Sequence, residues 1–165
     1  MTTLKAMFSY FLILVSTLSF GQTALNLFEV KILKENGSYK YSQIFSVEKR
    51  ASHIYEKANV WIAENYASAN DVIQLNTPKK IICKGNFALN NFKGGIAKHM
   101  LTIDIKENKY RLSVTNLIYY DSGAGNVAFE KMMFQKSIIK KAEKELSQIV
   151  KSLYEDIDNE ETDDW

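Results

Sequence analysis

Two alternating apolar stretches, separated by one tight turn, constrain the fold of this chain more than any other feature. On both sides of residues 107–108, apolar side chains recur at two-residue spacing: Leu101, Ile103, Ile105, Tyr110, Leu112, Val114 and Ile118. A period of two places alternate side chains on opposite faces of a β-strand, and so short a turn can join only antiparallel neighbours. The sequence therefore predicts a β-hairpin over residues 100–105 and 110–120, with one apolar face.

Three further segments have the pattern of strands. Residues 38–47 alternate in the same way and follow Asn36-Gly37, a pair typical of tight turns. Residues 72–75 and 81–89 are apolar stretches bounded by turn-forming residues. Together with the hairpin, these segments predict five strands.

Two segments instead repeat apolar residues at helical spacing. In residues 52–66, Ser52 is placed to cap the helix, and the apolar stripe is Ile54, Ala58, Trp61, Ile62 and Tyr66. In residues 129–154, lysines occupy one face and the apolar stripe is Phe134, Ile138, Ala142, Leu146, Ile149, Val150 and Leu153. Each helix must therefore bury one face against another element.

The predicted element order is β-α-β-β-β-β-α. Short turns between consecutive strands require a mostly antiparallel sheet, and two amphipathic helices on one face of it give an α+β two-layer fold. We expect one domain over residues 37–154, preceded by a lead segment at residues 23–36. With only one Pro and seven Gly in 165 residues, no linker divides this domain.

Residues 1–22 have the layout of a secretory signal peptide. One basic residue, Lys5, precedes an apolar run at residues 7–15, and small or polar residues follow as far as Gln22. The run is too short to cross a membrane, and no Cys follows it to accept a lipid. We expect export to the periplasm or beyond, cleavage near Gln22, and no membrane span in the mature protein.

Charge is distributed unevenly after that segment. Residues 155–165 contain seven acidic residues and no basic one, whereas residues 23–154 contain 20 basic and 12 acidic residues. A segment so acidic buries little apolar surface, so we expect a disordered tail at residues 155–165. Alternatively, the tail folds over a basic face or binds cations, although it lacks the glycine-centred loop of a calcium site.

The sheet face away from the helices holds the candidate binding residues. Alternation directs seven polar or charged side chains outward: Lys40, Ser42, Thr102, Asp104, Arg111, Ser113 and Thr115. Arg111 can donate a forked pair of hydrogen bonds to a carboxylate, and Thr102 and Thr115 offer hydroxyls. These three are the candidate site residues, against the alternative that the face is simply solvated.

No pattern in the chain indicates catalysis or metal binding. The two histidines, His53 and His99, are expected to be surface or packing residues, and a trio of Cys83, His99 and Asp104 is discounted because Cys83 alternates with core positions. The carboxylates of residues 23–154 lack the spacing of metal ligands. We therefore predict a protein that is not an enzyme and needs no cofactor or metal.

Several local strings resemble a family of exported bacterial domains of unknown function with a TBP-like fold. These strings are IYEKANVWI at residues 54–62, VIQ at 72–74, KG at 84–85, LTI at 101–103 and KYR at 109–111. The resemblance covers residues 37–120 and implies the fold, but it carries over no catalytic residue. TATA-binding proteins, which share the broad fold, wedge apolar side chains into DNA. Ser and Thr stand at those positions here, so we expect no nucleic acid as partner.

Two functions remain open. In the first, the protein is a non-enzymatic binding module that meets an unknown protein, peptide or glycan of the cell envelope through the open sheet face or an edge strand. In the second, it carries an apolar small molecule between the sheet and the C-terminal helix, which requires a cavity of several hundred cubic ångströms. In a binding module, five aromatic side chains should instead fill that interior: Tyr39, Tyr41, Phe45, Tyr110 and Phe134.

Overall fold

The sheet dominates the architecture. The computed structural model describes residues 27–66, 69–89, 95–121, 123, 125–132 and 135–159. Within them, seven antiparallel strands lie in the order β1-β2-β6-β5-β4-β3, and β7 also pairs with β6. The elements in chain order are β1 (Leu33–Glu35), β2 (Ser38–Ser46), α2 (Ala51–Asn65), α3 (Ala69–Val72), β3 (Ile73–Thr77), β4 (Lys80–Ala88), β5 (Ile96–Lys106), β6 (Lys109–Asp121), β7 (Gly125–Ala128), η1 (Phe129–Lys131) and α4 (Gln135–Asp158).

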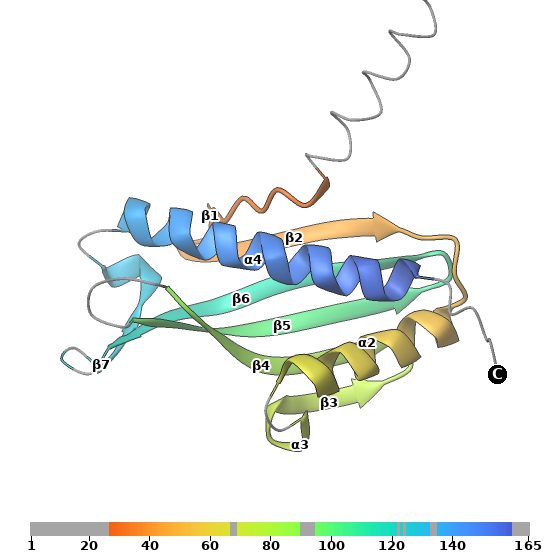
Figure 1. Cartoon of the computed structure of the whole chain (residues 1–165). Coiled ribbons are helices and arrows are strands. Elements are labelled where there is room, and N and C mark those ends of the chain that lie inside the picture. The colour runs from red at the N-terminus through yellow and green to blue at the C-terminus, as the bar shows by residue number, and fades with distance from the viewer. Residues whose placement is uncertain are drawn as a thin grey trace, which may run out of the picture.

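The two long helices, α2 and α4, lie on the same face of the sheet (Figure 1). The predicted two-layer α+β class is confirmed. So is the β5–β6 hairpin, in which Lys106 pairs with Lys109 and Ile103 with Leu112 across the turn. Asn108, in that turn, has φ +60°, a left-handed conformation that Asn tolerates better than most residues.

The lead segment expected at residues 23–36 does not lie outside the domain. From residue 27 it is described, and Val30 and Ile32 are buried in the core. The Val30 N–H donates to Ser147 Oγ at 3.1 Å and the Ile32 N–H to Glu143 Oε1 at 2.9 Å, both on α4. β1 then pairs with β2 through the Asn36-Gly37 turn. The domain therefore begins well before residue 37, because alternate residues of this segment pack against α4.

The first helix is not capped by Ser52, as we expected. α2 begins at Ala51, its N-cap is Arg50, and the Arg50 side chain makes no capping hydrogen bond. Instead, the Ala51 N–H donates to Glu107 Oε2 at 3.1 Å, from the turn between β5 and β6. A carboxylate at a helix N-terminus pairs with exposed N–H groups and opposes the helix dipole. The cap thus comes from a residue distant in sequence.

The last helix is shifted relative to its prediction. η1 occupies the start of the expected segment, and α4 continues to Asp158, so the first four residues of the expected tail are helical. Ile157, four residues after Leu153, is fully buried, which explains why the helix extends. Three of the expectations from sequence fall outside the described residues: those for residues 1–22, for Phe134 and for residues 160–165. No helix in the described part of the chain is long and apolar enough to cross a membrane.

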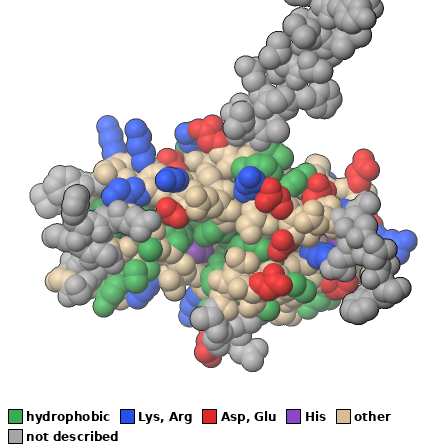
Figure 2. Space-filling model, viewed as in Figure 1, with side chains coloured by type: hydrophobic (Ala, Val, Ile, Leu, Met, Phe, Trp, Pro, Cys, Tyr) green, Lys and Arg blue, Asp and Glu red, His purple; other side chains and the backbone are tan. Residues whose placement is uncertain are grey.

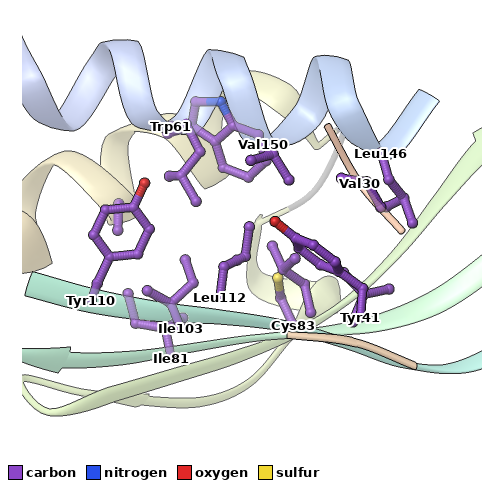
Figure 3. Packing of buried hydrophobic residues seen from close by; sticks show 14 of the residues in the cluster. Val30, Tyr41, Trp61, Ile81, Cys83, Ile103, Tyr110, Leu112, Leu146 and Val150 are labelled. Atoms are coloured by element: carbon purple, nitrogen blue, oxygen red, sulfur yellow. The ribbon is translucent and has the colours of Figure 1, made fainter. Parts of the chain in front are cut away.

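The core fills the space between the sheet and the helices (Figure 3). Trp61 of α2 is 1% exposed, and its indole N–H donates to Ser152 Oγ of α4 at 3.0 Å. Tyr41 and Tyr110 project from the sheet toward the helices, and the Phe45 and Tyr110 rings stack 5.1 Å apart. Three of the five aromatics expected to fill the interior, Tyr41, Phe45 and Tyr110, are buried, and Tyr39 is half-buried.

Candidate functional site

The face of the sheet opposite α2 and α4 carries the three candidate residues together. Arg111 is the cross-strand partner of Asp104, Thr102 of Ser113, and Thr115 of Met100. Side chains on this face are exposed or half-buried, whereas their neighbours in sequence are buried. The predicted direction of Arg111, Thr102 and Thr115 is therefore correct, and the three share one surface.

Arg111 is already engaged within the chain. Its Nε and Nη2 both donate to Asp104 Oδ2, at 3.1 and 2.8 Å, while Lys80 Nζ lies 3.0 Å from Asp104 Oδ1. Burial alone would raise the pKa of Asp104, but hydrogen bonds and positive charge from Arg111 and Lys80 outweigh it and lower that pKa. The forked donor that we expected to be available to a partner's carboxylate is thus satisfied by Asp104.

A hollow that sequence reasoning missed lies on the same face, toward the other end of the strands. Its volume is about 340 Å³, and three apolar residues and two lysines line it: Val72, Met100, Ile118, Lys84 and Lys98. We call it the cationic hollow. At its base are Gly85 and His99, a cross-strand pair on β4 and β5.

The side chain of His99 lies on the helix side, away from the cationic hollow. A Cβ on Gly85 would stand 2.6 Å from His99 Nε2 and 2.7 Å from the Tyr66 hydroxyl oxygen, which follows α2. The His99 and Phe87 rings lie 5.3 Å apart. Only Gly fits opposite His99, and the two residues present their backbone to the open face.

A bulge in β6 creates the hollow and corrects one prediction. Lys98 pairs with Ile118 and Met100 with Thr115, so β6 has one residue more than β5 in this stretch. Asn116 lies in this bulge and has a left-handed backbone conformation, with φ +53°. Beyond it, Leu117 is buried and Ile118 turns to the open face, although we expected Ile118 on the core face. Leu117 and Tyr119 form a second alternating set that could have revealed this change of face.

The two lysines of the cationic hollow have no acidic partner among the described residues. The Lys98 ammonium lies 4.6 Å from the centroid of the Tyr120 ring and donates to Asn126 Oδ1 at 3.1 Å. No described carboxylate lies within ion-pair distance of Lys84. Positive charge is therefore uncompensated next to an exposed apolar surface.

The Cys83, His99 and Asp104 trio does not assemble. Cys83 and His99 are buried on the helix side of the sheet, whereas Asp104 is on the open face with Arg111. Burial raises the pKa of the Cys83 thiol to about 12 and lowers the pKa of His99 to about 4. Both groups are therefore neutral near pH 7, a poor state for a nucleophile and its base.

The other histidine has a structural contact. His53 Nε2 lies 3.2 Å from the carbonyl oxygen of Ile157, so it joins the start of α2 to the end of α4. Among the described residues, no group of three His, Cys, Asp or Glu side chains could hold a metal ion.

Comparison with known proteins identifies the domain. A family model described as a domain of unknown function (DUF4468) with TBP-like fold matches residues 39–120. These residues belong to the DUF4468 family. The match includes β2, α2 and the strands from β3 to β6, and thus both Lys84 and Lys98. No curated protein matches the chain.

Solved structures share the fold of this chain. A TBP-like protein from Parabacteroides distasonis is 18% identical with a TM-score of 0.66, and the match covers 79% of this chain and 99% of that one. A DUF4468 family protein from Bacteroides ovatus is 10% identical with a TM-score of 0.57, covering 79% of this chain and 92% of that one. At these identities the likeness establishes the fold alone.

Proposed function

We propose that this DUF4468 protein is an exported, non-enzymatic binding module whose open sheet face docks an acidic segment of a partner protein. The observation that carries this proposal is the pairing of two uncompensated lysines, Lys84 and Lys98, with an apolar hollow of about 340 Å³. Acidic side chains of a partner would supply the missing counter-charge, and an apolar side chain between them would enter the hollow.

Charge on the rest of the open face supports an acidic partner. Lys80 and Arg111 share the single carboxylate of Asp104, so one positive charge remains in that cluster as well. Electrostatic complementarity mainly accelerates encounter and selects partners, while burial of an apolar anchor contributes most of the affinity. A segment with alternating acidic and apolar residues would satisfy both features.

The filled interior favours this module over the carrier of an apolar molecule. Tyr41, Phe45 and Tyr110 occupy the space beneath α4 where a carried ligand would lie. The absence of a paired nucleophile and base among the described residues is why we propose a binding role rather than an enzymatic one.

The exported location rests on the layout of residues 1–22. N-terminal sequencing of the native protein tests it: we expect a mature chain that begins within a few residues of Gln22. A native soluble protein that retains Met1 would contradict export.

The docking surface is tested with a fluorescent peptide of alternating Asp and Leu, titrated into the purified protein and followed by anisotropy. The double variant Lys84→Glu with Lys98→Glu should weaken binding by about tenfold or more, since it places like charges together. The matched control, Lys140→Glu with Lys144→Glu, changes the same charge on exposed positions of α4 and should leave the affinity nearly unchanged.

Three results would overturn the docking proposal. One is the absence of binding by the acidic peptide, and another is an equal loss in both charge-reversal pairs, which would indicate attraction by net charge alone. The third is tighter binding of a DNA duplex than of the peptide, which would make a nucleic acid the occupant of this face.

A further inference from the structure

A second hollow, on the helix side of the sheet, has a different chemistry. Its volume is about 320 Å³, and it lies between the end of α2, the middle of α4 and the end of β4. Five of its lining residues carry the following argument: Asn65, Tyr66, Phe87, Gln148 and Ile149. We call it the amide hollow. In Figure 2, which shows this side of the molecule, hydrophobic surface is visible in the band between the two helices.

The amides of this hollow have spare hydrogen-bonding capacity. Asn65 Nδ2 donates to the carbonyl oxygen of Trp61 at 2.9 Å, which leaves Asn65 Oδ1 available as an acceptor. Within the described residues, the side-chain amide of Gln148 has no hydrogen-bond partner, and the residue is exposed. Each amide can donate and accept at the same time.

Apolar walls complete the hollow. Tyr66 and Phe87 are half-buried aromatic residues, and Ile149 of α4 is half-buried as well. The Tyr66 ring is fixed edge-on against Trp61 with ring centroids 5.9 Å apart. Flat, partly exposed rings at the margin of a hollow can pack against a ligand with an apolar face.

None of the described residues that line the amide hollow is charged. A carboxylate, phosphate or ammonium ligand would therefore lose its hydration without finding a counter-charge. A purely apolar ligand would remove water from the amides and leave them unpaired. The ligand that fits is uncharged, has many hydroxyls that both donate and accept, and has an apolar C–H face.

We infer that the amide hollow binds a neutral saccharide. The planar amides of Asn65 and Gln148 pair with sugar hydroxyls, while the C–H face of a sugar ring packs against Phe87 or Tyr66. A volume of about 320 Å³ is near the lower end of ligand sites, so one or two sugar units are recognised. This site lies on the opposite side of the sheet from the cationic hollow, with which it shares the edge residue Asn86, and it does not depend on the protein partner proposed above.

The test is a titration of the isotopically labelled full chain with maltotriose, the fully N-acetylated chitotriose and trigalacturonate, followed by amide chemical shifts in NMR spectra. At least one neutral trisaccharide should shift the resonances of Phe87 and Gln148. Trigalacturonate should bind about tenfold more weakly, because its carboxylates find no cation in the hollow.

Variants assign the binding to the hollow. Gln148→Ala should weaken the neutral sugar about fivefold through loss of hydrogen bonds, and Phe87→Leu should do so through loss of the ring. Gln74→Ala, which removes an exposed amide on β3, should change the affinity by less than about twofold. Thermal unfolding of each variant confirms that it is folded.

The saccharide inference is overturned if neither neutral probe shifts the resonances of the hollow at millimolar concentration, if trigalacturonate binds as tightly, or if Gln148→Ala leaves affinity unchanged. Lys84→Glu with Lys98→Glu should leave sugar binding intact. If that variant abolishes it, the sugar occupies the cationic hollow and this inference fails.

Discussion

At the scale of single residues, the pair formed by Gly85 and His99 illustrates how burial controls chemistry. The imidazole is 4% exposed, and neither of its nitrogens has a hydrogen-bond partner among the described residues. A buried polar group without a partner costs free energy, and a buried charge costs more. His99 is therefore held neutral, and it fits only because Gly85 opposite it has no side chain.

His99 should make stability depend on pH. Its pKa falls from 6.5 to about 4 on folding, because burial penalises the charged form. Between those values the unfolded chain binds a proton that the folded chain does not, so the free energy of unfolding should decrease as pH falls from about 6.5 to about 4. The loss should total about 3 kcal/mol, measured by urea unfolding at a series of pH values.

The control for this titration is His99→Leu, which keeps an apolar side chain against Phe87 but cannot be protonated. The difference in pH dependence between the two proteins gives the contribution of His99 to stability, separately from the contribution of the carboxylates. Equal slopes for wild type and variant over this range would contradict the assignment.

At the scale of elements, contacts distant in sequence decide where helices and strands begin and change face. Glu107 caps α2 from the β5–β6 turn, and the bulge at Asn116 reverses which residues of β6 face the core. The bulge also places Ile118 beside Lys98 on the open face. Both features position sites: the first fixes the helix above the sheet, and the second forms the cationic hollow.

Removing the remote cap should destabilise the protein modestly. Glu107→Ala leaves the Ala51 N–H without its acceptor, and we expect a loss of about 1 kcal/mol in the free energy of unfolding. Glu107→Gln retains an acceptor oxygen but loses the charge, so its effect should be smaller. Ser52→Ala, which alters the cap expected from sequence, should have little effect; a larger loss for Ser52→Ala than for Glu107→Ala would contradict the remote cap.

At the scale of the whole molecule, the chain forms two opposite surfaces with different chemistry. One carries α2 and α4 and the uncharged amide hollow, and the other is the open sheet with the cationic hollow. Asn86, on β4 beyond the part that pairs with β3, lines both hollows. The segment before β1 contributes to the stability of the helix side, because Val30 and Ile32 are buried with α4.

A chain that begins at Leu33 should therefore be less stable than one that begins at Leu27. Loss of the buried Val30 and Ile32 side chains should reduce the free energy of unfolding by about 3 to 5 kcal/mol, measured by denaturant unfolding. Equal stability of the two chains would show that this segment contributes nothing to the fold.

Local pattern was sufficient to determine the fold class and the direction of most side chains. The two-residue and 3.6-residue periods depend only on backbone geometry, so the β5–β6 hairpin, the buried face of α2 at Trp61 and the outward direction of Arg111 followed from sequence. The tertiary structure decided what depends on contacts between distant residues. Arg111 forms an ion pair with Asp104, and Glu107 caps α2. The bulge at Asn116 places Ile118 beside Lys84 and Lys98 at one hollow. A periodic pattern specifies which face a side chain occupies, but which groups neutralise one another and where the surface is hollow depends on the register between strands.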